Sequence, residues 1–319
     1  MAVTVRDVAR HAGVSPATVS LVLNETPGQR IHPQTRERVR AAAAELGYAP
    51  NRIARALREG SARIVLLRTG PLLGGSLSSL IAGMEAELRE HGHTLLVSHQ
   101  QGEQHAGERA DDDILRAVAP RSVVDLGELY RSGAADGARK GRGADSRGDG
   151  GWVDGLARHT ATQLEHLLRR GRRRIAYAHP AVGLESLVEL RAAHMNDWLR
   201  RHGLPAAVRV TVPEEREGAA AAVLGLLGAH PDVDAVAAFS DDVAIGVLAG
   251  CAAEGVPVPG RLAVIGFDEG RLGRLWTPSL TTVRIDAEGY GRRLARSVLG
   301  LEPRPRAHRP SEVVVRESA

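Results

Sequence analysis

Two short helical patterns separated by a glycine open the chain, and they constrain its fold more than any other stretch. Residues 5–24 read VRDVARHAGVSPATVSLVLN. Thr4, with an acidic residue three positions later, predicts a capping box and a helix over residues 5–12. Ser15 then caps a second helix, and Pro16 takes its first position, where a missing N–H costs nothing. Two short helices joined by a tight glycine turn predict a helix-turn-helix, whose second helix enters the major groove of DNA.

A third helical pattern follows between Pro33 and Gly47. The apolar positions of all three patterns recur at helical spacing and predict one small shared core. They are Val5, Val8, Ala9, Ala12, Val19, Val22, Leu23, Val39, Ala42, Ala43 and Leu46.

The charge of the chain is placed unevenly. The net charge is +4, and the first 60 residues hold nine arginines against five acidic residues, so the remainder is balanced. A basic head on a neutral body indicates a polyanionic partner for the head. On its own, an excess this small favours DNA binding only modestly.

Three blocks in this region resemble the LacI/GalR (lactose-repressor-like) family of bacterial transcription regulators. They read TVRDVARHAGVSPATVSLVLN, TRERVRAAAAELGYAPN and RIARALR, in that order across residues 4–58. The resemblance implies a helix-turn-helix head over residues 1–49, followed by a hinge helix and linker over residues 50–60. The hinge would order only on DNA, pair with its copy in a dimer and insert Leu57 into the minor groove, which suits a helix too short to be stable alone.

The resemblance also implies which residues contact DNA. Four polar residues would contact phosphates or cap helix ends near them: Thr4, Ser15, Thr18 and Ser20. The outer face of the second helix and the loop before the third would supply Pro16, Ala17, Leu21, Asn24 and Arg30. Beside Leu57 in the hinge would lie Asn51, Arg52, Ala54 and Arg55.

Leu21 departs from the family pattern, because many members carry arginine there, a bidentate reader of guanine. Leucine cannot donate a hydrogen bond and can only pack against a thymine methyl or exclude a wrong base. We therefore expect the hinge and Arg30 to contribute more to operator recognition. The alternative is that Leu21 completes the apolar core of the head.

Strand-then-helix units recur from residue 61 onward. RIVLLR, TLLVSH, RIAYAH, AVAAF and LAVIGF each have the composition of a buried strand, and helical patterns alternate with them. Such alternation predicts doubly wound parallel sheets, which bind small molecules at the carboxyl ends of their strands.

Residues 237–269 and 278–286 resemble core segments of the same family. The resemblance implies two Rossmann-like subdomains of the periplasmic-binding-protein type around a cleft, forming an effector-binding and dimerisation core over residues 61–319. The N-subdomain would span about 61–171 and 286–312, and the C-subdomain about 172–285 and 313–319.

The resemblance places four effector-binding residues in this cleft: Ser76, Arg191, Ser240 and Asp268. Their chemistry suits a polyol, since they combine a fixed cation, hydroxyl groups and an acceptor-only carboxylate. For Arg191 and Asp268 the alternative is a surface ion pair. We interpret Asp241, which follows Ser240 in the sequence, as a helix N-cap.

Other departures weaken the expectation of a sugar ligand. An amide is common where this chain has Ser240, glycine where it has His194, and an acidic or polar residue where it has Arg158. Residues 131–151 contain seven glycines and no Val, Ile, Leu, Met or aromatic residue, so we interpret them as a loop rather than a strand. These features leave open a cleft that binds no small ligand.

Several function classes are disfavoured. The single cysteine, Cys251, cannot form an internal disulfide or a cysteine metal cluster, which suits the cytoplasm. The chain shows no signal peptide, membrane span, nucleotide-binding glycine motif or hydrolase motif, so we expect no enzyme, cofactor or metal site. No heptad tail follows the core, which favours a dimer over a coiled-coil tetramer.

The sequence therefore predicts a cytoplasmic, homodimeric repressor that binds a palindromic operator. A sugar-like small molecule in the core cleft would control it allosterically. The alternative is a repressor whose degenerate cleft answers to no small ligand.

Overall fold

A computed structural model describes residues 3–23, 31–48, 62–69, 75–99, 115, 118–128, 155–181, 184–302 and 311–319. The chain divides into two compact units, residues 1–62 and 63–319, and each is described by itself. Within the described ranges, no helix is both long enough and apolar enough to cross a membrane.

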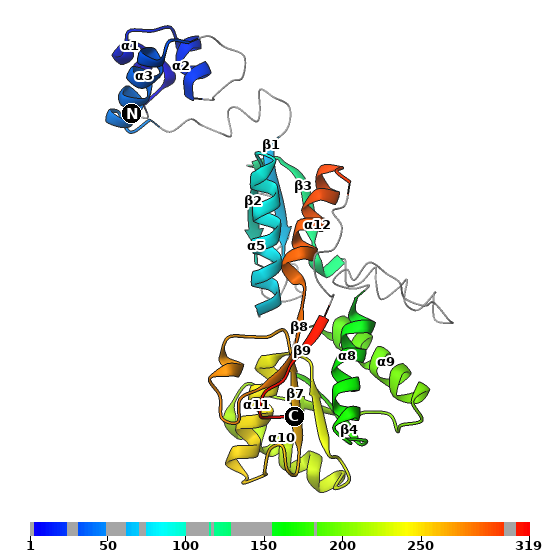
Figure 1. The fold of residues 1–319 in the computed structure, drawn as a ribbon. Helices are drawn as coiled ribbons and strands as arrows, with labels where there is room; N and C mark the ends of the chain where they lie inside the picture. Colours follow the sequence, from blue (N-terminus) through cyan, green and yellow to red (C-terminus); the bar gives the residue numbers. More distant parts are fainter. Residues whose placement is uncertain are drawn as a thin grey trace. The chain divides into compact units, whose positions relative to one another are not determined.

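The first unit is the predicted three-helix head (Figure 1). Its helices are α1 (Val5–Ala12), α2 (Pro16–Leu23) and α3 (Pro33–Glu45). Gly13 ends α1 with a φ of 63°, a left-handed conformation that glycine adopts without a Cβ clash. The buried core confirms the expected inner faces and comprises Val8, Ala9, Ala12, Val19, Val22, Val39, Ala42 and Ala43.

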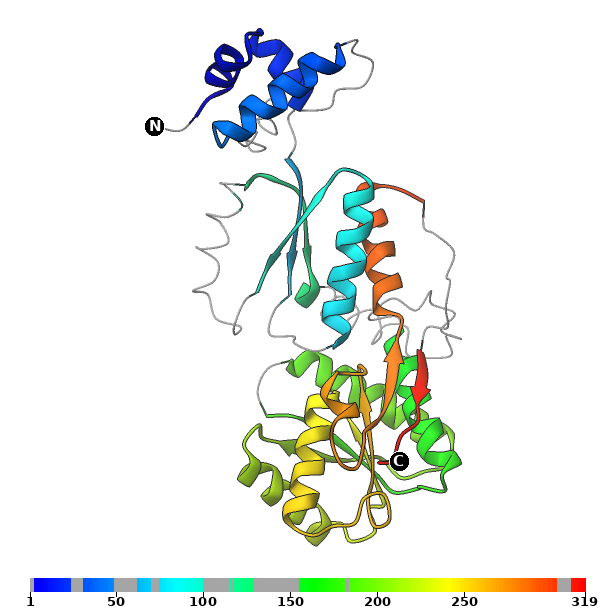
Figure 2. The same cartoon turned by 60° about the vertical axis from the view of Figure 1, so that its left-hand side comes forward.

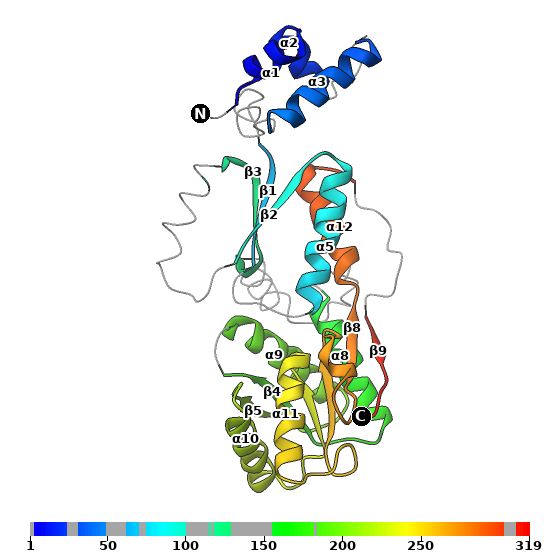
Figure 3. The ribbon, with the colours of Figure 1, turned by 90° about the vertical axis from the view of Figure 1, so that its left-hand side faces the viewer.

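The second unit begins with a three-stranded sheet in the order β2-β1-β3. Its strands are β1 (Ala62–Arg68), β2 (Thr94–Ser98) and β3 (Pro120–Asp125), and β1 and β2 are parallel. Two helices from distant parts of the sequence, α5 (Gly75–Glu90) and α12 (Ala287–Leu299), lie side by side on one face of this sheet (Figures 2 and 3).

A six-stranded sheet follows in the order β5-β4-β6-β7-β8-β9, in which only β9 is antiparallel to its neighbour. Its strands are β4 (Ile175–Pro180), β5 (Val208–Val212), β6 (Ala235–Ala238), β7 (Ala263–Phe267), β8 (Thr281–Ile285) and β9 (Ser311–Val314). The central strands β6 and β7 are buried throughout, which explains their continuous apolar runs.

Helices cover both faces of this sheet. Figure 1 shows α10 (Arg216–Ala229) and α11 (Asp241–Ala253) on one face, with α8 (Leu156–Arg169) and α9 (Glu185–Arg201) on the opposite face. A short 3-10 helix, η1 (Leu272–Arg274), follows β7. The alternating strand-helix order confirms the predicted α/β core.

The assignment of α8 differs from expectation. The family resemblance implies an N-subdomain that includes residues 61–171, but α8 packs against α9 and against β6 to β9 of the six-stranded sheet. Its inward stripe, which includes Leu156, Gln163 and Leu167, is buried there. The chain returns to the three-stranded sheet directly after β8, where Asp286 begins α12.

Candidate functional site

The amino-terminal end of α2 forms an accessible polar surface on the head. Ser15 caps the helix, since the Thr18 backbone N–H donates to Ser15 Oγ at 3.1 Å, and the two hydroxyl oxygens lie 2.9 Å apart. Pro16 and Ala17 are exposed, and Ser20 is partly exposed. Small side chains at a helix start permit close approach of a DNA backbone and of base edges.

The predicted capping box at the start of α1 is confirmed. The Asp7 carboxylate accepts hydrogen bonds from the Thr4 backbone N–H at 3.0 Å and from the Thr4 hydroxyl at 2.6 Å. These bonds hold the pKa of Asp7 below its ordinary value. The Thr4 side chain is therefore engaged in capping the start of α1.

Leu21 lies on α2 with a partly exposed side chain. The partly buried apolar side chains that pack against the described head core are Val5, Val14, Leu23, Ile31, Leu46 and Tyr48, and Leu21 is not one of them. Within residues 3–23 and 31–48, the head therefore offers Leu21 little apolar contact, which favours an outward role over the core alternative.

Some predicted DNA-contact residues lie outside the described residues: Asn24, Arg30, Asn51, Arg52, Ala54, Arg55 and Leu57. The glycine-rich segment 131–151 lies outside them as well.

Arg191 lies in the core of the second unit rather than in a surface ion pair. Its side chain is 1% exposed. Nη1 donates to the Phe239 carbonyl, and Nη2 donates to Gln163 Oε1 at 3.1 Å. The guanidinium carbon lies 4.0 Å from the centre of the Phe267 ring, a cation–π contact. Burial lowers the pKa of Arg191, although a guanidinium keeps its charge in proteins.

Asp268 follows β7 and contacts α5, a helix of the three-stranded sheet. Ser76 of α5 donates its hydroxyl to Asp268 Oδ1 at 2.6 Å. Burial raises the pKa of Asp268 to about 7, against the opposing effect of the Ser76 hydrogen bond. Asp268 and Glu269 have φ values of 105° and 52°, conformations that cost non-glycine residues about 1–3 kcal/mol each.

The predicted N-cap at Asp241 is wrong, because Ser240 occupies that position. Ser240 has the extended backbone of a cap, and its hydroxyl accepts the Val243 N–H at 3.3 Å. Asp241 is the first residue of α11 and is buried: its carboxylate accepts the Gly270 N–H at 2.6 Å and the Thr282 hydroxyl. Burial raises the pKa of Asp241 to about 6.

A cavity of about 30 Å³ lies at the carboxyl ends of β6 and β7, large enough for one or two water molecules. Its described lining comprises Leu156, His159, Leu187, Arg191, Phe239, Phe267, Asp268 and Ile285. The structure thus brings Arg191 and Asp268 to one cavity, with Ser76 hydrogen-bonded to Asp268. Ser240 is not among the described lining residues.

Comparison with known proteins agrees with this arrangement. Residues 4–51 match the family model of bacterial regulatory proteins, lacI family, and residues 164–319 match that of the periplasmic binding protein-like domain. The HTH-type transcriptional regulator GntR of Pseudomonas aeruginosa is 30% identical over 313 residues, which cover 93% of this chain and 89% of the relative. The chain belongs to the LacI family. It is therefore a DNA-binding transcriptional regulator, and the resemblance noted in its sequence is confirmed.

Solved structures confirm the LacI-family fold over nearly the whole chain. A lac repressor dimer bound to operator and the anti-inducer ONPF superposes with a TM-score of 0.74 at 22% identity, covering 100% of this chain and 99% of that one. A complex of the transcriptional regulator CelR with cellobiose gives a TM-score of 0.57 at 24% identity, covering 99% and 100%. The predicted two-subdomain core of the periplasmic-binding-protein type is confirmed.

His194 and Arg158 also depart from the LacI-family pattern. His194 is partly buried on α9, three residues after Arg191, and burial lowers its pKa. Arg158 is exposed on α8 and does not line the described cavity. Neither side chain fills the cavity as the structure describes it.

Sequence reasoning missed Gln163, which is fully buried on α8. Its Nε2 lies within hydrogen-bond distance of the carbonyls of Ala238, Ile265 and Gly266, at 3.0 to 3.2 Å. Because its Oε1 also accepts from Arg191, Gln163 links the arginine to the ends of β6 and β7. The sequence signal that could have revealed Gln163 is a polar residue at an inward-facing position of the α8 helical pattern.

Proposed function

We propose that this LacI-family regulator is a cytoplasmic repressor that binds a palindromic operator as a homodimer, and that a small effector in the core cleft sets its operator affinity. The observation that carries the proposal is the Ser76–Asp268 hydrogen bond beside Arg191. It joins a helix of one sheet to a strand end of the other. A ligand that replaces this contact binds two arrangements of the sheets unequally, and linkage then changes operator affinity.

Solved structures of similar proteins support this proposal. The lac repressor was solved as a dimer with operator and an anti-inducer, and CelR was solved with cellobiose. We propose a sugar-like polyol as the effector, held by Arg191, Asp268 and Ser76, with Ser240 nearby. The DNA contacts we propose are the ones expected from the sequence: the outer face of α2 and its cap, Arg30, and the hinge residues around Leu57.

Three experiments test this function. Full-length protein should select a palindrome from random duplexes, and sedimentation should show a dimer. Calorimetry against monosaccharides, disaccharides and nucleosides should then identify a ligand that changes operator affinity; a tenfold change corresponds to about 1.4 kcal/mol. Selection of no sequence over random DNA would overturn the repressor assignment.

A second candidate keeps the DNA binding and omits the effector. The small cavity favours it, as do the two guanidinium nitrogens of Arg191 that already donate to Phe239 and Gln163. No heat of binding from any member of the panel would support this candidate over the first.

Leu21→Arg should change which operator the protein selects. An arginine on the outer face of α2 can donate two hydrogen bonds to guanine, worth about 1–3 kcal/mol of discrimination, whereas leucine cannot. We expect the variant's selected sequences to gain guanine at one position of each half-site. Ala229→Arg, which adds the same charge to an exposed position on α10, is the matched control. If both variants select the wild-type sequence, Leu21 does not face the bases.

A further inference from the structure

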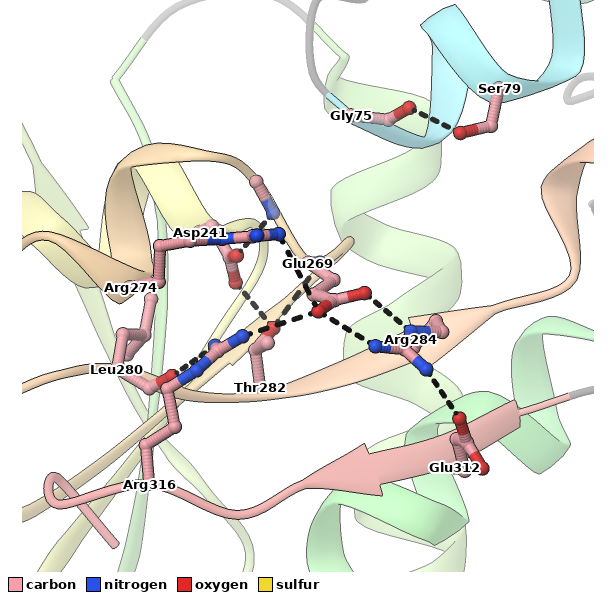
Figure 4. A network of polar contacts seen from close by, with 11 residues as sticks. Gly75, Ser79, Asp241, Glu269, Arg274, Leu280, Thr282, Arg284, Glu312 and Arg316 are labelled. Atoms are coloured by element: carbon pink, nitrogen blue, oxygen red, sulfur yellow. Dashed lines mark hydrogen bonds and ion pairs between the residues drawn. The ribbon is translucent and has the colours of Figure 1, made fainter.

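Glu269, next to Asp268, is surrounded by guanidinium groups (Figure 4). Its carboxylate accepts from Nε of Arg284 and, at 2.9 Å, from Nη2 of the same side chain. Arg316 Nη2 donates to it at 3.2 Å, and Arg274 lies 3.9 Å away. The hydrogen bonds from Arg284 hold the pKa of Glu269 below its ordinary value. Glu269 therefore stays charged and firmly bound.

The main partner of Glu269 belongs to a strand of the six-stranded sheet that leads to the other sheet, whereas Arg274 lies on η1 and Arg316 follows β9. Arg284 lies on β8 and donates at 2.8 Å to Glu312, its cross-strand neighbour on β9. β8 leads through Asp286 directly into α12, on the three-stranded sheet. Glu269, in the loop that follows β7 and Asp268, is thus attached through Arg284 to β8 and β9 (Figure 4).

The backbone of this loop is held in an unfavourable conformation. Asp268 and Glu269 are both left-handed, and such residues persist where several contacts determine them. Three successive amides are fixed: Asp268 N–H donates to the Val283 carbonyl at 2.9 Å, Glu269 N–H to Thr282 Oγ1 at 3.4 Å, and Gly270 N–H to Asp241 Oδ2 at 2.6 Å. The middle amide makes the longest of these bonds, so the Glu269 side chain supplies the strongest contact at that residue.

We propose that Glu269 is a positioning residue for the effector cleft: its ion pair with Arg284 maintains the left-handed turn that directs Asp268 at Ser76, and so couples the cleft to β8 and β9. The inference rests on the proposed function, because it takes Asp268 as the effector contact. An ion pair with a partner as exposed as Arg284, whose side chain is 50% exposed, contributes little to global stability. We therefore expect loss of the Glu269–Arg284 ion pair to affect the turn at residues 268–270 and not the global unfolding free energy.

Hydrogen exchange of the full-length protein tests the positioning role without DNA. Glu269→Gln removes the charge and keeps the shape, and Arg284→Gln breaks the same pair from the other side. We expect amide exchange at residues 268–270 to accelerate about tenfold in both, while the thermal midpoint stays near wild type. The matched control is Glu189→Gln, because Arg209 contacts Glu189 with two nitrogens at 2.7 and 3.0 Å on an exposed surface. Exchange at 268–270 that matches this control overturns the inference.

A double-mutant cycle on operator binding tests the route through Asp268. The probe is a duplex that the wild-type protein has selected from random DNA. Asp268→Ala, which removes the acceptor of the Ser76 hydroxyl, and Glu269→Gln should each change its Kd, and the double variant should match Asp268→Ala alone. Changes that add in the double variant overturn the inference, since Glu269 would then act independently. If Asp268→Ala leaves operator affinity unchanged, the Ser76–Asp268 contact does not set that affinity and the proposed effector function fails; the exchange result alone then decides whether Glu269 positions the turn.

Discussion

Alanine at Gly83 should cost the core about 3 kcal/mol of unfolding free energy or more, because it forces apart two helices whose backbones are in contact. A Cβ on Gly83 would lie 2.0 Å from the Glu288 carbonyl oxygen of α12 and 2.8 Å from its carbon. The contact is reciprocal, since a Cβ on Gly291 would lie 2.1 Å from the Leu80 carbonyl oxygen of α5. Backbone atoms inside helices cannot rotate away, so Gly291→Ala should have a similar effect.

Separation of α5 and α12 would also weaken a buried ion pair. Glu87 of α5 is fully buried and accepts from Arg296 Nη1 of α12 at 2.7 Å. Removing a partner from a buried carboxylate is costly, which is why we expect the destabilisation to reach the upper end of the usual range for overpacking.

Urea unfolding followed by circular dichroism measures this effect, with Gly225→Ala as the matched control. Gly225 is an exposed residue of α10, and an added Cβ there would meet no neighbouring atom within 4 Å, so alanine should stabilise the helix by about 1 kcal/mol. If Gly83→Ala and Gly225→Ala have the same sign, the close approach of α5 and α12 is wrong.

The head could be predicted almost residue by residue, because its boundaries are local. Thr4, Gly13, Ser15 and Pro16 each act on the backbone within a few positions, and the structure begins and ends α1, and begins α2, where they indicate. The apolar spacing of the strands likewise gave the α/β core. These features depend on neighbours in the sequence, where periodicity and capping are informative.

The cleft could be predicted only in part, because its contacts are long-range. Arg191 and Asp268 were expected there by resemblance to the family, and the structure places both at one cavity. Gln163 was missed because its partners on β6 and β7 are 75 to 103 residues away in the chain. The cap at α11 was misassigned because two adjacent residues could each serve, and burial of Asp241 against Gly270 decided between them.

The stability of the core should fall as pH rises towards 7, and Asp268→Asn should remove much of that fall. Burial raises the pKa of Asp268 from 3.8 to about 7, so the folded protein binds this proton more tightly than the unfolded chain does. Stability linked to such a group is fully present below the unfolded pKa and is lost as pH rises through the folded pKa. Asp241, whose pKa is raised to about 6, acts in the same direction.

Asparagine keeps an oxygen that accepts the Ser76 hydroxyl and carries no charge to bury. Each pH unit between the two pKa values is worth about 1.4 kcal/mol, so the variant should exceed wild type by up to about 4 kcal/mol near pH 8 and match it near pH 4. Urea unfolding across this range measures the difference. Asp232→Asn, at a carboxylate that is 63% exposed, is the control and should follow the wild-type curve.

Parallel curves for Asp268→Asn and wild type would show that the surroundings of Asp268 do not raise its pKa. The same ionisation bears on the effector. A polyol that donates hydrogen bonds to Asp268 binds its carboxylate form, so its affinity should decrease as pH falls below about 7. Titration of an identified effector near pH 6 and pH 8 checks this, because a ligand that binds equally at both values does not use the Asp268 carboxylate.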